Sequence, residues 1–376
     1  MTKEEYVTFE TIETSKHEIL SCSYSQWYEL LKSHTVESKI IKPLPQSFIE
    51  YLNSDSIKLP PAHNYDPELV INSDNEYSDW EEDEQEQEDE EAGDADVDAD
   101  ADGNKDGDGH EHQITVSDFQ DLHDQIISNI HELGGVVTPK LNWSAPKDAK
   151  WMMPDNTIRC DHVNDIYLLL NTSDHIVDDL DYPFASVDLE QDGLNSNDVN
   201  VDVEYELVLR KWMDINPALE FRTFIKDNKI IGISQRDLNH YMYLESLKET
   251  IHDKIHNFIY DTVIPVLSEK LNLSKYIVDV YIPRPFNKVY IVDINPFTRK
   301  SSPLLFTWNE LLLIDTLGHD EDNYEFKLVN ETNLGRFAKK EYSESQVPYD
   351  VVDASMNSEA MIELAREWDK LQVQTE

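Results

Sequence analysis

The sequence has few cysteines, few glycines and no long apolar run. Its two cysteines, Cys22 and Cys160, cannot build a disulfide framework or a four-thiolate zinc site, so we expect reduced thiols in a cytoplasmic protein. Only 10 glycines occur in 376 residues, which excludes collagen-like and glycine-rich repeat proteins. No apolar stretch reaches about 18 residues, so we expect no membrane span. Residues 1–10 lack the apolar core of a signal peptide.

Basic residues are scarce as well. The chain carries 31 Lys and Arg against 77 Asp and Glu, a formal net charge of −46. Nucleic acid and anionic membranes would be repelled by this charge, so we expect neither as a direct partner. Hydrophobic residues make up 39% and aromatic residues 10%, enough for a packed core, and the length favours two domains or lobes. We expect the chain alone to be monomeric.

A large part of the negative charge lies in one segment. Residues 74–111 contain 20 acidic residues and a single lysine, which gives −19 there and leaves −27 for the other 338 residues. This composition, with almost no aliphatic residues, predicts disorder. The expected organisation is an N-terminal part of a first lobe (1–72), an acidic disordered insert (73–112), the remainder of the first lobe (113–200), a second lobe (201–345) and a C-terminal helix or tail (346–376).

Hydrophobic periodicity predicts the main elements. Apolar residues at helical spacing predict helices near residues 28–31, 48–52, 119–130, 244–263 and 361–371. Strands are predicted at residues 40–45, 205–212, 221–225, 229–234, 276–282 and 289–294. Asp227-Asn228 marks a hairpin turn, Gly134-Gly135 ends a helix, and residues 178–202 resemble an acidic loop. The mixture indicates an α+β fold with mainly antiparallel sheets.

Two aspartates interrupt strands that are otherwise aliphatic. A buried carboxylate without a partner is costly, so Asp279 and Asp293 each need a cation or several hydrogen-bond donors. Side chains i and i+2 of a strand share a face, so Asn295 points the same way as Asp293. If the hairpin pairs Ile282 near Val289, Asp279 lies almost opposite Asp293 and the three side chains converge. Carboxylate and amide oxygens without His or Cys suit magnesium, which usually binds together with phosphates.

The alternative for these two acids is ion pairing with Arg284, Arg299 or Lys300, and the pattern alone does not choose between a metal and a basic side chain. The common nucleotide and catalytic motifs are absent. The sequence has no GxxxxGK[ST] phosphate loop, no GxGxxG, no HExxH and no GxSxG.

Other candidate residues also have two interpretations. Lys140 follows a Gly-Gly break in a short strand, where it would reach phosphate oxygens or be an ordinary surface lysine. Trp143 and Trp212 would cover an aromatic ring or lie in the core. Glu220 and Arg222 share a strand face and would bind a ligand or pair with each other.

Five stretches, taken together, resemble one family. They are 139–146 (PKLNWSAP), 207–212 (LVLRKW), 216–222 (NPALEFR), 278–284 (VDVYIPR) and 292–297 (VDINPF). In this order they closely resemble the cell division cycle protein 123 family, and the similarity runs from residues 24–27 through 335–337. An ordered match of this length is more specific than any single motif.

The resemblance implies an ATP-grasp fold, in which two lobes clamp ATP with a lysine, hinge backbone and Mg²⁺ instead of a glycine-rich loop. The second lobe (201–345) would then bind nucleotide and metal. The implied site consists of Lys140 at the phosphates, Asn142, Trp143 and Ala145 in a nucleotide loop, Arg210, Trp212 and Asp214 at the adenine hinge, Glu220 and Arg222 toward ribose and phosphates, and Asp279, Asp293 and Asn295 as magnesium ligands. Lys147 replaces an arginine that is common at its position in the family.

The resemblance also implies a function. Members assemble eukaryotic translation initiation factor 2 by binding its gamma subunit and helping its alpha subunit to join, which supports translation initiation and the cell cycle. We therefore expect an ATP-binding assembly chaperone rather than an enzyme. The alternative is an ATP-grasp ligase or kinase that modifies a protein partner, although no general base in the sequence favours it. A third possibility is an acidic adaptor whose folded part is only a scaffold.

Overall fold

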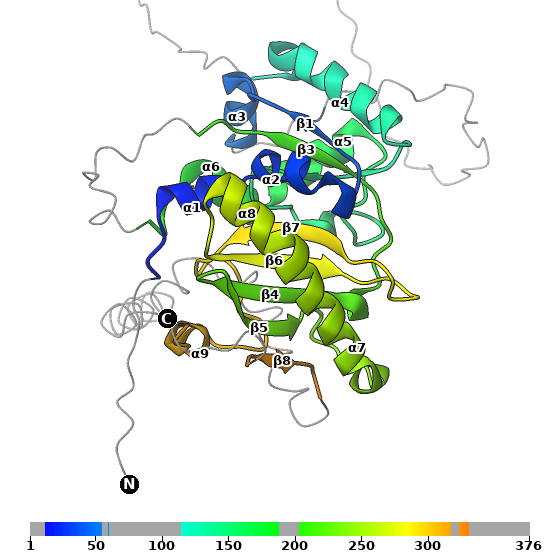
Figure 1. Cartoon of the computed structure of the whole chain (residues 1–376). Helices are drawn as coiled ribbons and strands as arrows, with labels where there is room; N and C mark the ends of the chain where they lie inside the picture. Colours follow the sequence, from blue (N-terminus) through cyan, green and yellow to red (C-terminus); the bar gives the residue numbers. More distant parts are fainter. Residues whose placement is uncertain (1–11, 55–58, 60–113, 188–202, 317–322, 331–376) are drawn as a thin grey trace, which may run out of the picture.

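The computed structural model describes residues 12–54, 59, 114–187, 203–316 and 323–330. The acidic insert expected at 73–112 and the helix expected at 361–371 lie outside these residues. Two sheets organise the described chain, a small one in the first lobe and a larger one in the second (Figure 1). This arrangement confirms the expected α+β class with two lobes and mainly antiparallel sheets.

The small sheet has its last strand in the middle. It contains β1 (Ser38–Ile41), β2 (Val137–Lys140) and β3 (Leu207–Lys211), in the order β1-β3-β2, and both pairings are antiparallel. The expected boundary at residue 201 is therefore wrong for β3, which pairs with strands of the first lobe. The strand predicted at 40–45 ends at Ile41, because Pro43 and Pro45 have no N–H to donate to a ladder. Lys140 is the last residue of β2, opposite Val208, and its ammonium contacts Asp293 of the large sheet.

Helices cover the small sheet. Their bounds are α3 (Gln46–Leu52), a 3-10 turn at Val116–Phe119, α4 (Gln120–Glu132), a 3-10 turn at Lys150–Met152, α5 (Val163–Thr172) and α6 (Asp174–Asp181). Phe48, Tyr51, Phe119 and Tyr167 form an aromatic cluster in this core, with ring centroids 5.2 to 6.1 Å apart. The predicted helical spacing of 119–130 is confirmed by α4. Two glycines with φ of 97° and 87° end it, as predicted.

The large sheet contains both predicted hairpins. Its strands are β4 (Glu220–Lys226), β5 (Lys229–Gln235), β6 (Tyr276–Tyr281), β7 (Tyr290–Pro296) and β8 (Glu325–Lys327), in the order β7-β6-β4-β5-β8. All pairings are antiparallel except β5 with β8. Asp227 and Asn228 join β4 to β5 with φ of 53° and 58°, the left-handed conformations that a tight hairpin turn requires.

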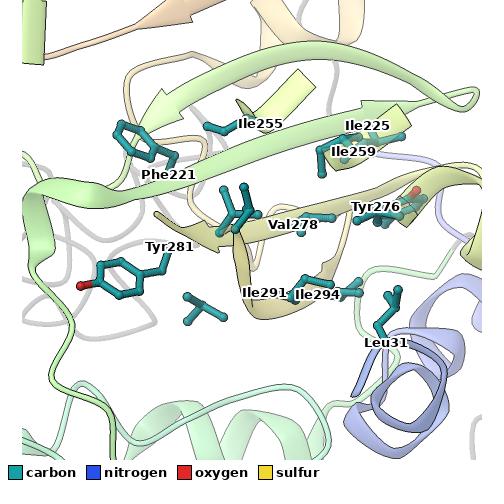
Figure 2. Close-up of a cluster of buried hydrophobic side chains, with 14 of the residues drawn as sticks. Leu31, Phe221, Ile225, Ile255, Ile259, Tyr276, Val278, Tyr281, Ile291 and Ile294 are labelled. Atoms are coloured by element: carbon teal, nitrogen blue, oxygen red, sulfur yellow. The ribbon is translucent and has the colours of Figure 1, made fainter. Parts of the chain in front are cut away.

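Helical layers bury both faces of the large sheet. One face packs against α7 (Tyr243–Phe258), a π turn at Ile259–Val263 and α8 (Ile264–Leu271). Figure 2 shows Ile255 and Ile259 of this layer above Val278 of β6. The opposite face carries Phe224 and Ile277, which pack with α9 (Trp308–Leu313). The helix predicted at 244–263 is confirmed and continues to Leu271. The π turn lies just before Pro265, whose ring would clash with a regular preceding turn.

The N-terminal helices join the two lobes. Between the sheets lie α1 (Lys16–Ser21) and α2 (Tyr24–Leu31), and α2 contacts both β7 and α8 (Figure 1). The Tyr24 hydroxyl lies 2.8 Å from Ser38 Oγ of the small sheet. The Thr35 hydroxyl donates to the carbonyl of Ile291 in the large sheet, at 2.9 Å. These bonds fix the sheets relative to each other. No helix in the described ranges is long and apolar enough to span a bilayer.

One sequence prediction in the first lobe is wrong. Residues 178–181 belong to α6, where an acidic loop was expected from Asp178 onward. Ser173 caps the helix by accepting a hydrogen bond from the Ile176 N–H, and Ile176 and Leu180 bury one face. Two apolar residues four positions apart and a good cap outweigh the charge of the aspartates between them. The rest of the predicted loop, from residue 188 to 202, lies outside the described residues.

Candidate functional site

A cavity of about 830 Å³ opens between the lobes. Trp143, Ser144 and Lys147 line it from the loop after β2, and Arg222, Arg236 and Asn295 line it from the large sheet and its ends. Its volume lies in the upper part of the range for small-molecule sites, about 300–1,000 Å³. Three of the predicted site residues, Trp143, Arg222 and Asn295, therefore meet at one cavity although the sequence separates them widely.

The lining is basic, in contrast to the chain as a whole. The charged side chains around the cavity are five basic ones, Lys147, Lys150, Arg222, Arg236 and Lys300, and two acidic ones, Asp148 and Asp179. A chain with a net charge of −46 thus gathers positive charge at one concave site. Low-dielectric walls focus such a field, so the cavity favours an anionic ligand.

An ion pair crosses between the two sheets beside the cavity. Lys140 Nζ lies 2.6 Å from Asp293 Oδ1, which joins the end of β2 to β7. The Lys140 side chain is completely buried, and its ammonium lies 5.2 Å from the centre of the Tyr24 ring. The interpretation of Lys140 as an ordinary surface lysine is therefore wrong. A buried ammonium needs a partner, and here a carboxylate and an aromatic face supply one.

Asp279 is bound by two arginines. It lies opposite Asp293 in the β6–β7 register, and the sequence predicted it almost opposite. Arg222 donates from both Nε and Nη2 to its carboxylate at 2.7 and 2.8 Å, and Arg236 Nε lies 3.3 Å away. Burial alone would raise the pKa of Asp279, but the Arg222 guanidinium holds that pKa well below its usual range.

The basic partners expected for this carboxylate were wrong. Arg284, Arg299 and Lys300 were predicted as alternatives to a metal, and Arg222 and Arg236 take that position instead. Glu220 and Arg222 also do not pair with each other. Glu220 lies 3.2 Å from Arg236, because β5 is the neighbour of β4 on the side away from β6.

Asp293 and Asn295 have side-chain oxygens of the kind that bind a divalent cation. Both residues are half-buried on one face of β7, and Asn295 lines the cavity. Asp293 Oδ1 accepts from Lys140 and from the Ile294 N–H. In the part of the chain that the structure describes, neither Asp293 Oδ2 nor the side-chain amide of Asn295 has a hydrogen-bond partner. These two oxygens fit a magnesium ion, whereas Asp279 retains only the unused lone pairs of its Arg-bound oxygens.

The predicted nucleotide loop is held by hydrogen bonds between its side chains and the backbone of other segments. Asn142 donates to the Glu204 carbonyl and accepts from the Glu206 N–H, both at 3.0 Å. Trp143 Nε1 donates to the Ile19 carbonyl at 2.8 Å while its ring lines the cavity. Asn142 and Ala145 are not part of the cavity lining. Their contribution is to fix the loop that presents Trp143.

The predicted hinge residues lie outside the cavity lining. Arg210 stacks over the Tyr24 ring at 5.8 Å, and the Trp212 N–H donates to the Val136 carbonyl. Asp214 follows in the connection to β4. The buried Arg210 Nε has no hydrogen-bond partner among the described residues, whereas Glu220 Oε1 lies 3.2 Å from Arg236 Nε. A buried polar atom without such a partner is uncommon, so it marks a place where a polar ligand would be accommodated.

Comparison with known proteins assigns the chain to a family. The model of the D123 family matches residues 27–355. The chain belongs to the D123 family. A relative from Lodderomyces elongisporus, named "Translation initiation factor eIF2 assembly protein", is 51% identical over 371 residues, which cover 98% of this chain and 94% of that protein. "Cell division cycle protein 123" of Candida glabrata is 45% identical and covers 99% of this chain and 97% of that protein.

A solved D123 family structure has the same fold. The structure of Cdc123 from Schizosaccharomyces pombe superposes with a TM-score of 0.62 at 27% identity, over 85% of this chain and 100% of that one. The resemblance to the cell division cycle protein 123 family that the sequence motifs indicated is thus confirmed.

Sequence reasoning missed several cavity residues of this D123 chain. Arg236 was not a candidate, although it directly follows the buried strand β5 and binds both Glu220 and Asp279. Lys300 and the pair Ser144–Asp179 were missed as binding groups too. A usable signal was present for Arg236: basic residues are scarce in this chain, and one at a strand end next to a buried sheet is conspicuous.

Proposed function

We propose that this chain is an ATP- and magnesium-binding assembly chaperone for eukaryotic translation initiation factor 2. It binds the gamma subunit, promotes formation of the heterotrimer in the cytoplasm, and thereby supports translation initiation and cell-cycle progression. Relatives named for this assembly role align with nearly the whole chain, which supports the proposal. The single structural observation that carries the nucleotide part is the basic cavity bordered by the unpaired oxygens of Asp293 and Asn295.

Each wall of the cavity supplies a different group to ATP. Arg222 and Arg236 come from neighbouring strands and face the cavity as a fixed pair of guanidinium groups, since Asp279 orients both. Such forks suit phosphate oxygens. Lys147 lies across from them and adds a flexible ammonium. We infer that these three side chains bind the phosphate chain of ATP.

The metal would be held at the β7 edge. Asp293 Oδ2 and the Asn295 amide oxygen are the protein ligands, and Asp279 contributes through its remaining lone pairs. When bound, Mg²⁺ would neutralise phosphate charge and fix the phosphates in one arrangement. Lys140 remains beside this group because its ammonium already contacts Asp293, so it reaches phosphate oxygens without a large movement.

The hinge side would receive the nucleoside. Arg210 Nε is buried without a hydrogen-bond partner among the described residues, and a ribose hydroxyl is a suitable partner for it. Glu220, whose Oε1 lies 3.2 Å from Arg236, would accept from a second ribose hydroxyl with its remaining lone pairs. The backbone after β3, around Trp212 and Asp214, would bind the adenine edge. Because ATP touches both lobes in this arrangement, it stabilises the closed pair of lobes that the partner protein recognises.

Factor binding tests this proposal. Purified full-length chain is mixed with the gamma subunit, with and without Mg-ATP, and co-purification and subsequent joining of the alpha subunit are measured. The expected result is retention of gamma that Mg-ATP strengthens. Asn295→Ala should weaken the Mg-ATP effect by about tenfold, since it removes a proposed metal ligand.

The matched control is Asn257→Ala, which replaces an exposed asparagine of α7 that does not line the cavity. It should behave like the wild type. Equal gamma retention and heterotrimer yield for Asn295→Ala and wild type would contradict a role of the metal site in assembly.

A further inference from the structure

The end of helix α6 grips the loop that forms one wall of the cavity. Asp179 is only 5% exposed, and its two carboxylate oxygens accept hydrogen bonds from Ser144, from the N–H at 2.8 Å and from the hydroxyl at 3.0 Å. Ser144 follows Trp143 directly, and both line the cavity. One carboxylate therefore fixes both the backbone and the side chain of this loop position.

The same helix end also holds the opposite wall. Lys300, in the loop after β7, donates to the carbonyls of Tyr182 at 2.6 Å and Asp178 at 3.3 Å. The C-terminal end of a helix carries partial negative charge, which favours an ammonium there. The Tyr205 hydroxyl, just before β3, donates to the Leu180 carbonyl at 2.7 Å. Two segments that line the cavity, and the chain just before β3, are thus anchored on one helix end.

We propose that Asp179 is a positioning residue of the nucleotide site: acting through Ser144, it holds the loop that carries Trp143 in the conformation that receives ATP. The inference rests on the proposed function, because it assumes that ATP occupies the cavity. It goes beyond that function by assigning a role to a helix whose residues were not candidates at all.

A charged side chain is costly to bury, so supporting the fold does not by itself explain why residue 179 is an aspartate. Burial raises the pKa of Asp179 to about 6, although the two bonds from Ser144 oppose the rise. A neutral side chain would bind a serine without this cost. A carboxylate accepts from both Ser144 groups at once, which leaves the loop a single orientation. The charged and titratable groups that face Asp179 are Lys300 and Lys140 from the second lobe and β2, and Tyr205 before β3.

Calorimetric titration of Mg-ATP into the full-length chain tests the proposal. At about pH 7.5, Asp179→Asn should bind ATP about tenfold more weakly than the wild type, since it loses one charged acceptor. At about pH 5 the wild-type carboxyl is mostly protonated and resembles the variant, so the difference should nearly vanish. The terminal phosphate of ATP titrates in this range too, and comparing the two proteins at each pH cancels its effect.

Two further variants separate positioning from folding. Asp181→Asn makes the same charge change on the same helix. Among the described residues its side chain accepts a hydrogen bond from Asn53, just after α3, and not from the cavity loop, so its ATP affinity should match the wild type at both pH values. Ser144→Ala keeps the N–H bond and loses the hydroxyl, so it should lose affinity by a smaller factor and keep the pH effect.

Three outcomes overturn the inference. If Asp179→Asn binds ATP as tightly as the wild type at about pH 7.5, or if its deficit is the same at both pH values, Asp179 is a fold contact only. If the wild type itself shows no ATP binding at either pH, the proposed function fails first and the inference fails with it, which the wild-type titration alone reveals.

Discussion

At the scale of single residues, one aspartate outside the cavity lining is shared by two arginines that line it. Asp279 is 2% exposed and bridges Arg222 of β4 and Arg236 after β5. Its carboxylate neutralises part of the positive charge and leaves the outward donors of both guanidinium groups for a ligand. Arg222 Nη1 also donates to the Ser302 carbonyl at 2.7 Å, which fixes its plane. This one buried acid therefore holds both arginine side chains in place before a ligand binds.

Replacing that acid should cost stability. Asp279→Asn leaves the buried Arg222 guanidinium next to a neutral amide, whereas Arg236 keeps Glu220 as a partner. Breaking a buried pair in this way typically costs about 3–5 kcal/mol. Urea unfolding measures the free energy of unfolding, and the exposed Asp253→Asn of α7 is the control, expected within about 0.5 kcal/mol of wild type. A loss below about 1 kcal/mol for Asp279→Asn would contradict the assigned pairing.

The pH dependence of the same pair has a definite sign. The folded-state pKa of Asp279 is held below its unfolded value, so its stabilisation is complete above the unfolded pKa of about 4. It is lost as the pH falls further, through the folded-state pKa. The acid limb of wild-type unfolding should therefore be steeper than that of Asp279→Asn.

Whether the sequence predicts a contact depends on how far apart the two residues lie in the chain. The approach of Asp279 to Asp293 was predicted from the hairpin that joins their strands, but their direct pairing depends on a β-bulge between Asp279 and Val280 that the sequence did not indicate. The arginine partners of Asp279 were not predicted, because they require the strand order β6-β4-β5, which local patterns do not specify. The buried state of Lys140 likewise depends on a contact 153 residues away in the chain.

At the scale of elements, the large sheet depends on close packing around β5. Gly232 lies opposite Phe224 in the β4–β5 ladder, and a Cβ placed on it would lie 2.7 Å from Cζ of Phe306. Phe306 is 3% exposed and packs against Phe224 of β4. The glycine therefore provides the space in which this ring lies, on the same face of the sheet as the cavity-lining Arg222.

Gly232→Ala should destabilise the second lobe by overpacking, by about 1–3 kcal/mol. Thermal or urea unfolding measures the loss. In the double mutant Gly232→Ala/Phe306→Leu the shorter side chain relieves the clash, so its loss should be smaller than the sum of the two single losses. Strictly additive losses would show that the ring and the glycine do not interact as described.

Elements with strong local patterns were predicted well. Both hairpins and the helices α2, α3, α4 and α7 appear where apolar spacing and turn residues placed them. Helix α6 was missed because its aspartates favoured a loop, whereas its two buried apolar residues, Ile176 and Leu180, indicate a helix. The short strand β8 was missed because it pairs in parallel with β5, a partner about 90 residues earlier, and three residues carry no periodicity of their own.

At the scale of the whole molecule, charge and connectivity act together. The chain is strongly acidic, yet five basic side chains converge on the cavity between its lobes. The lobes are joined there by the Lys140–Asp293 ion pair and by the N-terminal helices that contact both sheets. A ligand that binds basic groups from both walls would stabilise this arrangement, and the acidic remainder would direct the molecule toward basic protein surfaces. Composition predicted the acidity, whereas the basic cavity appears only after folding.

The most direct test of this account is calorimetric titration of ATP into the full-length chain with and without Mg²⁺. The account predicts saturable binding by the wild type that Mg²⁺ strengthens. Asp293→Asn and Asn295→Ala should each lose at least about tenfold in affinity with Mg²⁺ present, and Asn257→Ala should lose none. Without Mg²⁺, Asn295→Ala should match the wild type, since it removes a metal ligand only. An absence of saturable binding by the wild type, or full Mg²⁺-dependent affinity in Asn295→Ala, would contradict the account.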